Sequence, residues 1–376
     1  MAQTCPYYPK CGGCTCRQLP YARQLEQKTA YIQKLLAPFG VKAVPCRGGA
    51  EDACRNKVHL AFTLEAGAVR AGFFDSRTHR VVPVAKCPMH GDWYEKLVTA
   101  VEAWAAQCRI RPYDPRTGKG SLRFVAARYL GERLMVTVVS QLPKLPGLDK
   151  LHAALEAVFG PTALWLNVND RRDSAVFSRN FRHIAGPKKL RGTMLDVAFE
   201  LSPDAFFQVN TQVAEMMYSR ILQLAKEIAP ATVVDAYSGI GITSLLFARA
   251  GMQVTSVEQV PSAVEDAKSM AKYNKLDGKV RALCGDCAKV LPKLHPKGDT
   301  LFFVDPPRRG LGESVCRTIA EFSPKYVLYL SCGPEALAED IRRLQKGGYR
   351  LKLAEPYDLF PHTDHVETIC LLERVW

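Results

Sequence analysis

Two residues near the end of the chain have the types and positions that covalent catalysis needs. Cys332 follows the apolar run KYVLYLS and precedes a segment of helical pattern, so we expect it at a strand end, facing the start of a helix. The partial positive charge of a helix N-terminus lowers a thiol pKa and favours the nucleophilic thiolate. Glu367, in HTDHVETICLLE, is our candidate for the base that removes a proton after a thiolate has added to a ring, with His362 and His365 as second choices. Either residue alone would more often be a buried thiol or a solvated carboxylate, so the combination carries the prediction.

A second group of residues indicates a bound nucleoside. The segment DAYSGIG, from Asp235 to Gly241, follows a strand pattern and lets the backbone approach a ligand before the next helix. Glu258 ends the following strand, where a carboxylate accepts hydrogen bonds from both hydroxyls of a ribose. A nicotinamide dinucleotide is the alternative, but GIGITS lacks the third glycine of that pattern, so we favour a nucleoside methyl donor.

Two further motifs lie where such ligands would bind. Asp305 begins DPPRRG after the run TLFFV, and open α/β sheets bind ligands at the carboxyl ends of their strands. The motif SPDAFFQVN, at 202–210, offers Gln208 to the cofactor and Phe206 or Phe207 for stacking on an extruded base. Taken alone, the two phenylalanines would more often be core residues.

The N-terminal segment CPYYPKCGGC indicates a metal site. It supplies Cys5, Cys11 and Cys14, and Cys87 in VAKCPMH offers a fourth thiolate. Four such ligands suit an iron-sulfur cluster or a tetrahedral zinc ion, and spacing alone leaves both open, with Cys16 able to replace one ligand. The 13 cysteines are an odd number in a large chain without a signal-peptide pattern, which disfavours a disulfide scaffold.

The elements that must position these residues follow two patterns. After the helical stretch YARQLEQKTAYIQKLLAPFG, segments such as KVHLAFTLE and the pair LRFVAARYL and RLMVTVVSQL, joined at Gly-Glu, predict an antiparallel sheet with intervening helices. From about residue 200, short apolar runs alternate with helices in the βαβ order of a parallel sheet. We therefore expect an α/β protein in which 1–90 hold the cysteine loop and the start of a central region, 91–198 form a central α+β region, and 199–376 form a Rossmann-like domain.

The composition of the chain limits the classes of molecule that the protein is expected to bind. The length of 376 residues suits two domains, and 47% apolar with 23% charged residues is typical of folded proteins. The balance of 51 Lys and Arg against 37 Asp and Glu gives a charge of +14, which favours a polyanion such as RNA. Without an apolar run of membrane-spanning length or a signal peptide, we expect a cytoplasmic protein that does not contact membranes. We also expect it to be a monomer.

Taken in order, CPYYPKCGGC, SPDAFFQVN, DAYSGIG, DPPRRG, SCGP and HVE resemble the motifs of the RNA (uracil-5-)-methyltransferase family over nearly the whole chain. The resemblance implies S-adenosylmethionine as methyl donor, Cys332 as the nucleophile that adds to carbon 6 of uracil, and Glu367 as the base that takes the proton from carbon 5. It also implies that the cofactor is contacted at Gln208, Tyr237 and Glu258, with Asp305 between cofactor and uracil.

The same resemblance bears on the metal and the substrate. The iron-sulfur branch that methylates 23S ribosomal RNA carries a four-cysteine [4Fe-4S] site, and this chain is similar to it at Cys5, Cys11, Cys14 and Cys87. We therefore expect 5-methyluridine in a loop of 23S ribosomal RNA as the product, and transfer RNA as the second choice of substrate. A base paired in a helix would hide carbon 6, so the uridine must be flipped out.

The chain departs from the family pattern in three places. Family members usually have Cys-Asn-Pro where this chain has Cys-Gly-Pro at 332–334, and a polar residue is common at the position of Ile242. Many larger members begin with a β-barrel domain. Because the cysteine cluster starts at Cys5, we expect no barrel here, and we expect RNA recognition by the central sheet and by basic residues such as Arg55, Lys57, Arg308 and Arg309.

Two alternatives belong to other classes of protein. A cytosine-5 RNA methyltransferase would need a second cysteine in its own motif. A non-catalytic RNA-binding module with iron-sulfur or zinc would bind RNA without modifying it, and product analysis separates both from a uridine methyltransferase.

Overall fold

The computed structural model describes residues 5–171, 173, 175–295 and 299–375. The chain forms two compact units. Unit 1 comprises 1–18, 50–192 and 201–204, and unit 2 comprises 19–49, 193–200 and 205–376. This division differs from the three expected stretches, since 19–49 belong with the C-terminal sheet. Ile32 and Leu36 bury their side chains in the core of that sheet, which ties this early segment to it.

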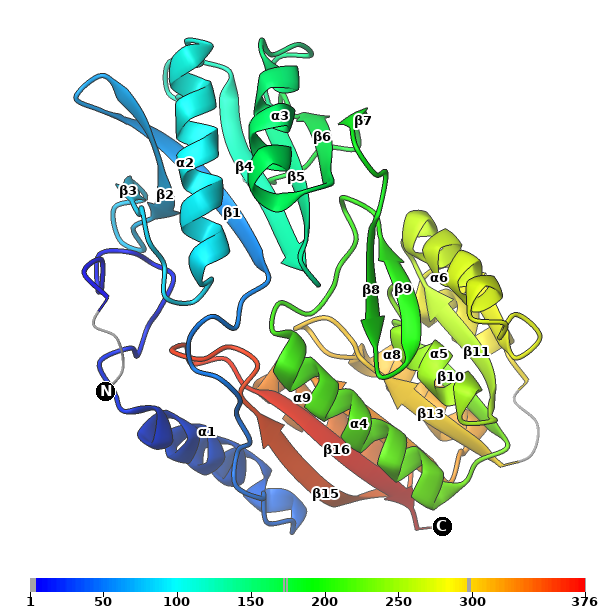
Figure 1. Ribbon diagram of the computed structural model, residues 1–376. Helices are drawn as coiled ribbons and strands as arrows, with labels where there is room; N and C mark the ends of the chain where they lie inside the picture. The colour runs from blue at the N-terminus through cyan, green and yellow to red at the C-terminus, as the bar shows by residue number, and fades with distance from the viewer. Residues whose placement is uncertain (1–4, 172, 174, 296–298, 376) are drawn as a thin grey trace. The chain divides into compact units, whose positions relative to one another are not determined.

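Unit 1 is a sheet with two helices on one face (Figure 1). Its seven strands have the order β3-β2-β1-β4-β5-β6-β7 in the described residues, with bounds Lys57–Glu65 (β1), Ala68–Phe74 (β2), Val81–Pro83 (β3), Leu122–Leu130 (β4), Arg133–Ser140 (β5), Thr162–Val168 (β6) and Phe181–Ala185 (β7). The helices are α2 (Asp92–Gln107) and α3 (Leu148–Phe159), and their apolar residues pack on one side of these strands.

The expected hairpin of unit 1 is confirmed, but the sheet is not entirely antiparallel. β4 and β5 pair across Gly131 and Glu132, whose positive φ values of 54° and 61° suit a tight hairpin turn. β5 and β6 are parallel, because α3 crosses between them and returns the chain in the same direction.

Unit 2 is a doubly wound sheet of order β12-β11-β10-β13-β14-β16-β15. β10 to β14 are parallel, while β16 runs antiparallel between β14 and β15. The bounds are Thr232–Ala236 (β10), Gln253–Glu258 (β11), Val280–Cys284 (β12), Thr300–Val304 (β13), Tyr326–Ser331 (β14), Tyr349–Tyr357 (β15) and Glu367–Arg374 (β16). A separate ribbon pairs β8 (Leu190–Met194) with β9 (Val197–Leu201).

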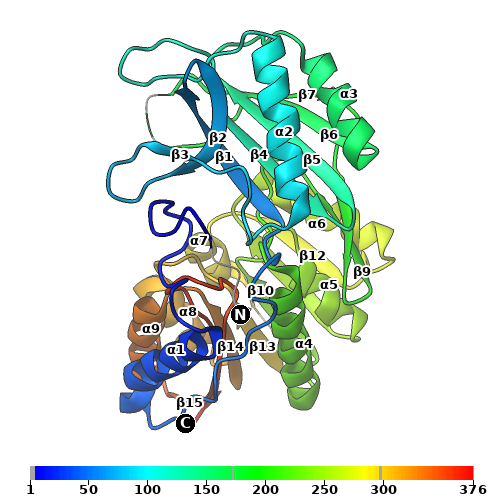
Figure 2. The same ribbon diagram turned by 60° about the vertical axis from the view of Figure 1, so that its left-hand side comes forward.

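Helices cover both faces of the unit 2 sheet (Figure 2). One core joins the strands to α1 (Tyr21–Leu36), η1 (Ala37–Phe39), α7 (Cys287–Val290), α8 (Gly312–Phe322) and α9 (Pro334–Lys346). The other helices are α4 (Thr211–Ile228), α5 (Ile242–Arg249) and α6 (Pro261–Tyr273), and a short η2 (Leu291–Lys293) follows α7. Because helices cover both faces of the sheet, side chains on both sides of each strand are buried, which explains why these strands are continuous apolar runs.

Candidate active site and cysteine cavity

The parallel strands of unit 2 bring most of the predicted site residues to one edge. β11 ends at Glu258, and Tyr237, Asp305 and Cys332 directly follow the last residues of β10, β13 and β14. Because these strands are parallel, their carboxyl ends meet at the same edge. β10 has β11 on one side and β13 on the other, which is the switch point where open α/β sheets bind ligands.

The strand register sets Cys332 opposite Glu367. β16 runs antiparallel to β14, and Ser331 pairs with Thr368. The next positions outward are Cys332 and Glu367, so the candidate nucleophile and the candidate base belong to neighbouring strands at the same edge. Burial raises the pKa of the Cys332 thiol, and the Glu367 and Asp305 carboxylates raise it further, which is expected of charges close to it.

Two carboxyl groups beside Cys332 hold their protons unusually strongly. Burial raises the pKa of Glu367 to about 7, and the charge of Arg308 partly opposes the rise. Burial also raises the pKa of Asp305 well above its ordinary value, with further contributions from the charges of Glu367 and Asp235. A carboxyl whose pKa lies near neutrality can accept and release a proton under physiological conditions.

The thiol itself does not have the low pKa expected from the sequence. α9 begins at Pro334, so Cys332 does precede a helix N-terminus. Its pKa is nevertheless raised to about 12, because burial and the carboxylates of Glu367 and Asp305 outweigh the charge of Arg308. The expectation of a lowered pKa was wrong, since the partial charge of a helix end is weaker than burial combined with two acidic neighbours.

The Gly333 departure from the family pattern has a steric reason. A Cβ atom at this position would lie 2.4 Å from the carbonyl oxygen of Arg308, closer than atoms approach without a shift. Glycine therefore lets the segment after β13 pack against the turn that carries Cys332. An asparagine at 333 would require the Arg308 backbone to move.

Asp235 is a buried carboxylate at the switch point. Its Oδ2 accepts hydrogen bonds from the hydroxyls of Thr243 (2.7 Å) and Ser244 (2.5 Å), whereas Oδ1 has no hydrogen-bond partner among the described residues. Burial raises its pKa to about 6, against the effect of the two hydroxyls. A cationic ligand group beside Oδ1 would favour the ionised form. The sequence motif included Asp235, but its role was not predicted.

The turn after β10 is shaped around Glu258. This carboxylate accepts the backbone N–H of Gly239 at Oε2 (3.0 Å) and that of Val260 at Oε1 (2.8 Å), and each oxygen retains a lone pair for a ribose hydroxyl. Gly239 has a φ of 54° and open space where a Cβ would stand. Tyr237 has a φ of 66°, a left-handed conformation that costs a non-glycine residue about 1–3 kcal/mol and clusters at ligand sites.

The two phenylalanines in the segment before α4 have different surroundings. Phe207 is buried and stacks on Phe199 with ring centroids 4.8 Å apart, so it is a core residue. Phe206 is 69% exposed and can take a base on its ring. Gln208 is buried and hydrogen-bonds the Tyr218 hydroxyl, whose pKa is raised by burial and then by Asp305.

A pocket in unit 2 contains Cys332. Its volume is about 490 Å³, and its lining includes Arg308, His365 and four residues of α1: Gln24, Gln27, Lys28 and Tyr31. Arg308 Nη2 lies 3.2 Å from His365 Nε2, which joins two walls of the pocket. Sequence reasoning missed the contribution of α1, because a helical pattern does not reveal which site its polar face will border.

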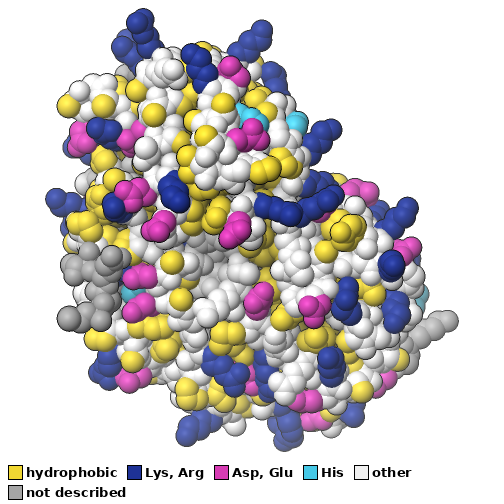
Figure 3. All heavy atoms as spheres, viewed as in Figure 1, with side chains coloured by type: hydrophobic (Ala, Val, Ile, Leu, Met, Phe, Trp, Pro, Cys, Tyr) yellow, Lys and Arg dark blue, Asp and Glu magenta, His cyan; other side chains and the backbone are white. Residues whose placement is uncertain are grey.

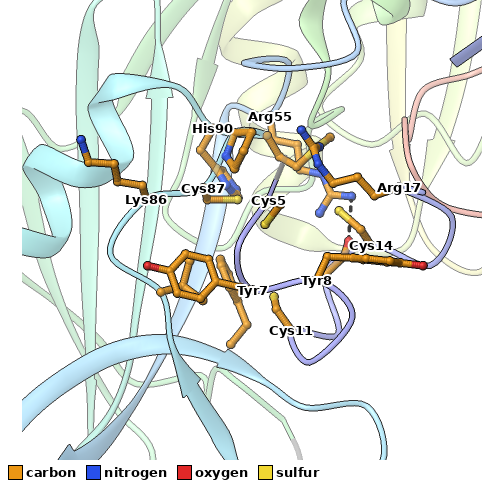
Figure 4. A pocket seen from close by; sticks show the side chains of 15 residues that line it. Cys5, Tyr7, Tyr8, Cys11, Cys14, Arg17, Arg55, Lys86, Cys87 and His90 are labelled. Atoms are coloured by element: carbon orange, nitrogen blue, oxygen red, sulfur yellow. Dashed lines mark hydrogen bonds between the residues drawn. The ribbon is translucent and has the colours of Figure 1, made fainter. Parts of the chain in front are cut away.

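Unit 1 contains a cavity of about 70 Å³ lined by Cys5, Cys11, Cys14 and Cys87 (Figure 4). Cys87 lines it with the three N-terminal cysteines, while Cys16, the alternative ligand, is buried and is not among the described lining residues. In the described part of the chain, no three His, Cys, Asp or Glu side chains are grouped as the ligands of a single metal ion.

Arginines and a glycine shape the cavity. Arg17 bonds Asp52 at 2.8 Å. Burial raises the pKa of Cys14, and the charges of Arg55 and Arg17 partly oppose the rise. Burial also raises the pKa of Cys11, and it raises that of Cys87 to about 12. A Cβ at Gly12 would lie 2.8 Å from the Phe74 carbonyl oxygen, so glycine lets the loop pack against β2.

The basic residues expected to bind RNA have different surroundings. Arg308 and Arg309 are exposed in unit 2, whereas burial and the charge of Arg128 lower the pKa of Lys57 in unit 1 to about 8. Arg55 lines the cysteine cavity. On the face in Figure 3, lysines and arginines are interspersed with acidic side chains. Within the described residues, no helix is long and apolar enough to cross a membrane.

Comparison with known proteins identifies the family. The sequence profile of the tRNA (Uracil-5-)-methyltransferase family matches residues 297–375. An "Uncharacterized RNA methyltransferase" of Halalkalibacterium halodurans is 34% identical over 98% of this chain and 82% of its own. Another, of Caldanaerobacter subterraneus, is 34% identical over 99% of this chain and 84% of its own. The chain belongs to the RNA (uracil-5-)-methyltransferase family.

A solved structure of this family shares the fold. The tRNA (uracil-54, C5)-methyltransferase of Pyrococcus abyssi, in complex with S-adenosyl-L-homocysteine, aligns with a TM-score of 0.80 and 23% sequence identity. The alignment covers 97% of this chain and 86% of that one. The expected α/β class with a Rossmann-like methyltransferase sheet is therefore confirmed.

Proposed function

We propose that this RNA methyltransferase transfers the methyl group of S-adenosylmethionine to carbon 5 of a uridine, by way of a covalent bond between Cys332 and carbon 6. The observation that carries the proposal is the position of Cys332 opposite Glu367 at the ends of β14 and β16. A nucleophile and a base side by side are what this substitution requires, since the ring must first be activated and then lose a proton.

The chain's residues account for each bond that changes. Cys332, having lost its proton to solvent, forms a bond from Sγ to carbon 6, and the displaced electron pair makes carbon 5 nucleophilic. S-adenosylmethionine, when bound, would supply the methyl group to carbon 5, and the electron pair of the broken sulfur–methyl bond would stay on sulfur, so that S-adenosylhomocysteine is the leaving group. Glu367 then takes the proton from carbon 5, and the electron pair left behind restores the double bond and expels the thiolate. A pKa of about 7 allows Glu367 to accept that proton near neutral pH.

The cofactor site combines the predicted contacts with one more. We assign Glu258 to the ribose hydroxyls, Gln208 and Tyr237 to further cofactor contacts, and Asp305 to the space between cofactor and uracil. The unpartnered Oδ1 of Asp235 suits the ammonium group of the methionine part, because a buried carboxylate is stabilised by a cation. The S-adenosyl-L-homocysteine complex of the Pyrococcus abyssi protein supports this type of cofactor.

For the substrate we propose a single-stranded loop of 23S ribosomal RNA. The exposed ring of Phe206 supports recognition of a flipped base, because aromatic rings stack on unpaired bases. Transfer RNA is the second candidate, and the similarity to the tRNA (uracil-54, C5)-methyltransferase of Pyrococcus abyssi supports it.

We further propose that Cys5, Cys11, Cys14 and Cys87 hold a [4Fe-4S] cluster. All four line one cavity of unit 1. Four cysteine thiolates are the ligand set of a [4Fe-4S] cluster, with one thiolate per iron. When bound, the cluster would supply a cross-link that fixes the N-terminal loop to the segment before α2, for RNA binding.

The test uses 23S ribosomal RNA and transfer RNA transcribed with 5-fluorouridine. Fluorine replaces the proton that Glu367 would remove, so the Cys332 adduct persists and shifts the protein on a denaturing gel. Wild type and Cys284→Ala, whose exposed thiol belongs to β12 and not to β14, should form the adduct with the true substrate. Cys332→Ala should form none, and continued methylation by Cys332→Ala would overturn the proposal.

A further inference from the structure

One face of α1 forms a wall of the pocket that contains Cys332. Gln24, Gln27, Lys28 and Tyr31 follow the i, i+3, i+4, i+7 spacing of a helix face, and all four line the pocket. The pocket volume of about 490 Å³ falls within the range of about 300–1,000 Å³ that holds drug-sized ligands. One pyrimidine base is smaller than such a ligand, so the pocket has room beside it.

Two of the four α1 residues are structural. Lys28 Nζ lies 2.6 Å from Asp358 Oδ1, and both side chains are almost fully buried. Gln24 Oε1 accepts the backbone N–H of His362 at 2.9 Å. These contacts fasten α1 to the segment that leads into Glu367, so this wall of the pocket is fixed relative to the candidate base.

The other two α1 residues are exposed on the rim. Tyr31 has 38% of its surface exposed, and its hydroxyl donates a hydrogen bond to Glu335 in the first turn of α9. That bond holds the aromatic ring in one position between α1 and the helix that follows Cys332. Gln27 lies one helical turn before Tyr31, and its amide can both donate and accept hydrogen bonds.

We propose that Tyr31, Gln27 and Glu335 form a second base-binding subsite, which takes the nucleotide next to the methylated uridine. The inference rests on the proposed function, since it needs a uridine at Cys332. An exposed, fixed aromatic ring is a stacking platform for an unpaired base. The carboxylate of Glu335, which the Tyr31 hydroxyl contacts, disfavours a phosphate beside this ring and favours the N–H groups of a base edge.

The probes are single-stranded RNA heptamers with a central 5-fluorouridine. One has an ordinary nucleotide on each side, and two others have an abasic residue on the 5′ or the 3′ side. Binding is measured by fluorescence anisotropy and adduct formation on denaturing gels. The variants are Tyr31→Ala, Tyr31→Phe and Glu335→Gln, and the control is Tyr273→Ala, which removes a 63% exposed tyrosine from the end of α6.

Tyr31→Ala should raise the Kd for the intact heptamer by roughly 5- to 150-fold, the loss that removal of a base-stacking ring produces. Tyr31→Ala should have no effect on the Kd for one of the two abasic heptamers. That heptamer identifies whether the 5′ or the 3′ neighbouring base stacks on Tyr31. Tyr31→Phe keeps the ring but loses the bond to Glu335 that fixes it, so its Kd should lie between those of wild type and Tyr31→Ala. Glu335→Gln should change which neighbouring base is preferred.

Equal Kd values for Tyr31→Ala and Tyr273→Ala with every heptamer would overturn the subsite. Failure of the proposed function has a different signature, because wild type would then bind the heptamers without forming an adduct. In that case the anisotropy comparison still decides whether Tyr31 contacts a base.

Discussion

Glu367→Gln tests whether the carboxyl at the start of β16 is the base. Its pKa is about 7, against an ordinary value of 4.5. About a tenth of this carboxyl is therefore ionised at pH 6 and about nine tenths at pH 8, so proton removal from carbon 5 should accelerate roughly tenfold across that interval. A glutamate of ordinary pKa would be ionised at both pH values and would give a flat profile.

The assay is the decay of the methylated covalent adduct in a single turnover, followed by the release of RNA from protein on denaturing gels. Wild type should show the tenfold rise. Glu367→Gln cannot accept the proton, so its adduct should accumulate and decay about 10²- to 10⁴-fold more slowly. His365→Gln tests the rival base and should still release the RNA.

The same pKa shift predicts the sign of a stability effect. Because the pKa of Glu367 is higher in the folded protein, the folded state holds this proton between about pH 4.5 and 7, and the stability it confers is lost as the pH rises through that window. Relative to wild type, Glu367→Gln should gain up to about 3 kcal/mol in free energy of unfolding between pH 5 and pH 8.

In the adduct-decay assay, a wild-type decay rate that does not change with pH, or rapid RNA release by Glu367→Gln, would refute the assignment of Glu367 as the base.

Three further outcomes follow from the structure. Cys87→Ser should lose the absorbance near about 400 nm that an iron-sulfur cluster gives, whereas Cys284→Ser should keep it; equal spectra would contradict the cluster. Lys28→Met leaves a buried carboxylate without its partner and should lower the free energy of unfolding by about 3–5 kcal/mol, while Arg23→Ala, in an exposed pair, should change it by less than about 1 kcal/mol. Glu258→Ala should weaken S-adenosylmethionine binding at least about tenfold by calorimetry, through the loss of hydrogen bonds to a charged acceptor, and an unchanged Kd would count against the ribose contact.

The sequence predicted the unit 2 sheet because its signals are local. Each parallel strand is a short apolar run, and the polar residue that ends it, such as Asp305 or Cys332, marks the edge where ligands bind. Strand order and the antiparallel β16 then bring Glu367 next to Cys332. The sequence offered both residues as candidates, but it did not predict that they would be neighbours.

Other features depend on contacts between distant segments. The pKa of Cys332 is set by Asp305 and Glu367, which come from other strands, so the adjacent helix N-terminus gave the wrong sign. α1 belongs to unit 2 because Ile32 and Leu36 pack in the apolar core of that unit. Periodicity identifies such a face but not the surface it packs against.

The most direct test of the central claim is methylation of unmodified total RNA by the purified protein with labelled S-adenosylmethionine, followed by nucleoside analysis and mapping of the modified position. We predict labelled 5-methyluridine at one position in large-subunit ribosomal RNA. The same product in transfer RNA would keep the reaction and change the substrate. No labelled nucleoside, or labelled 5-methylcytidine, would contradict the account.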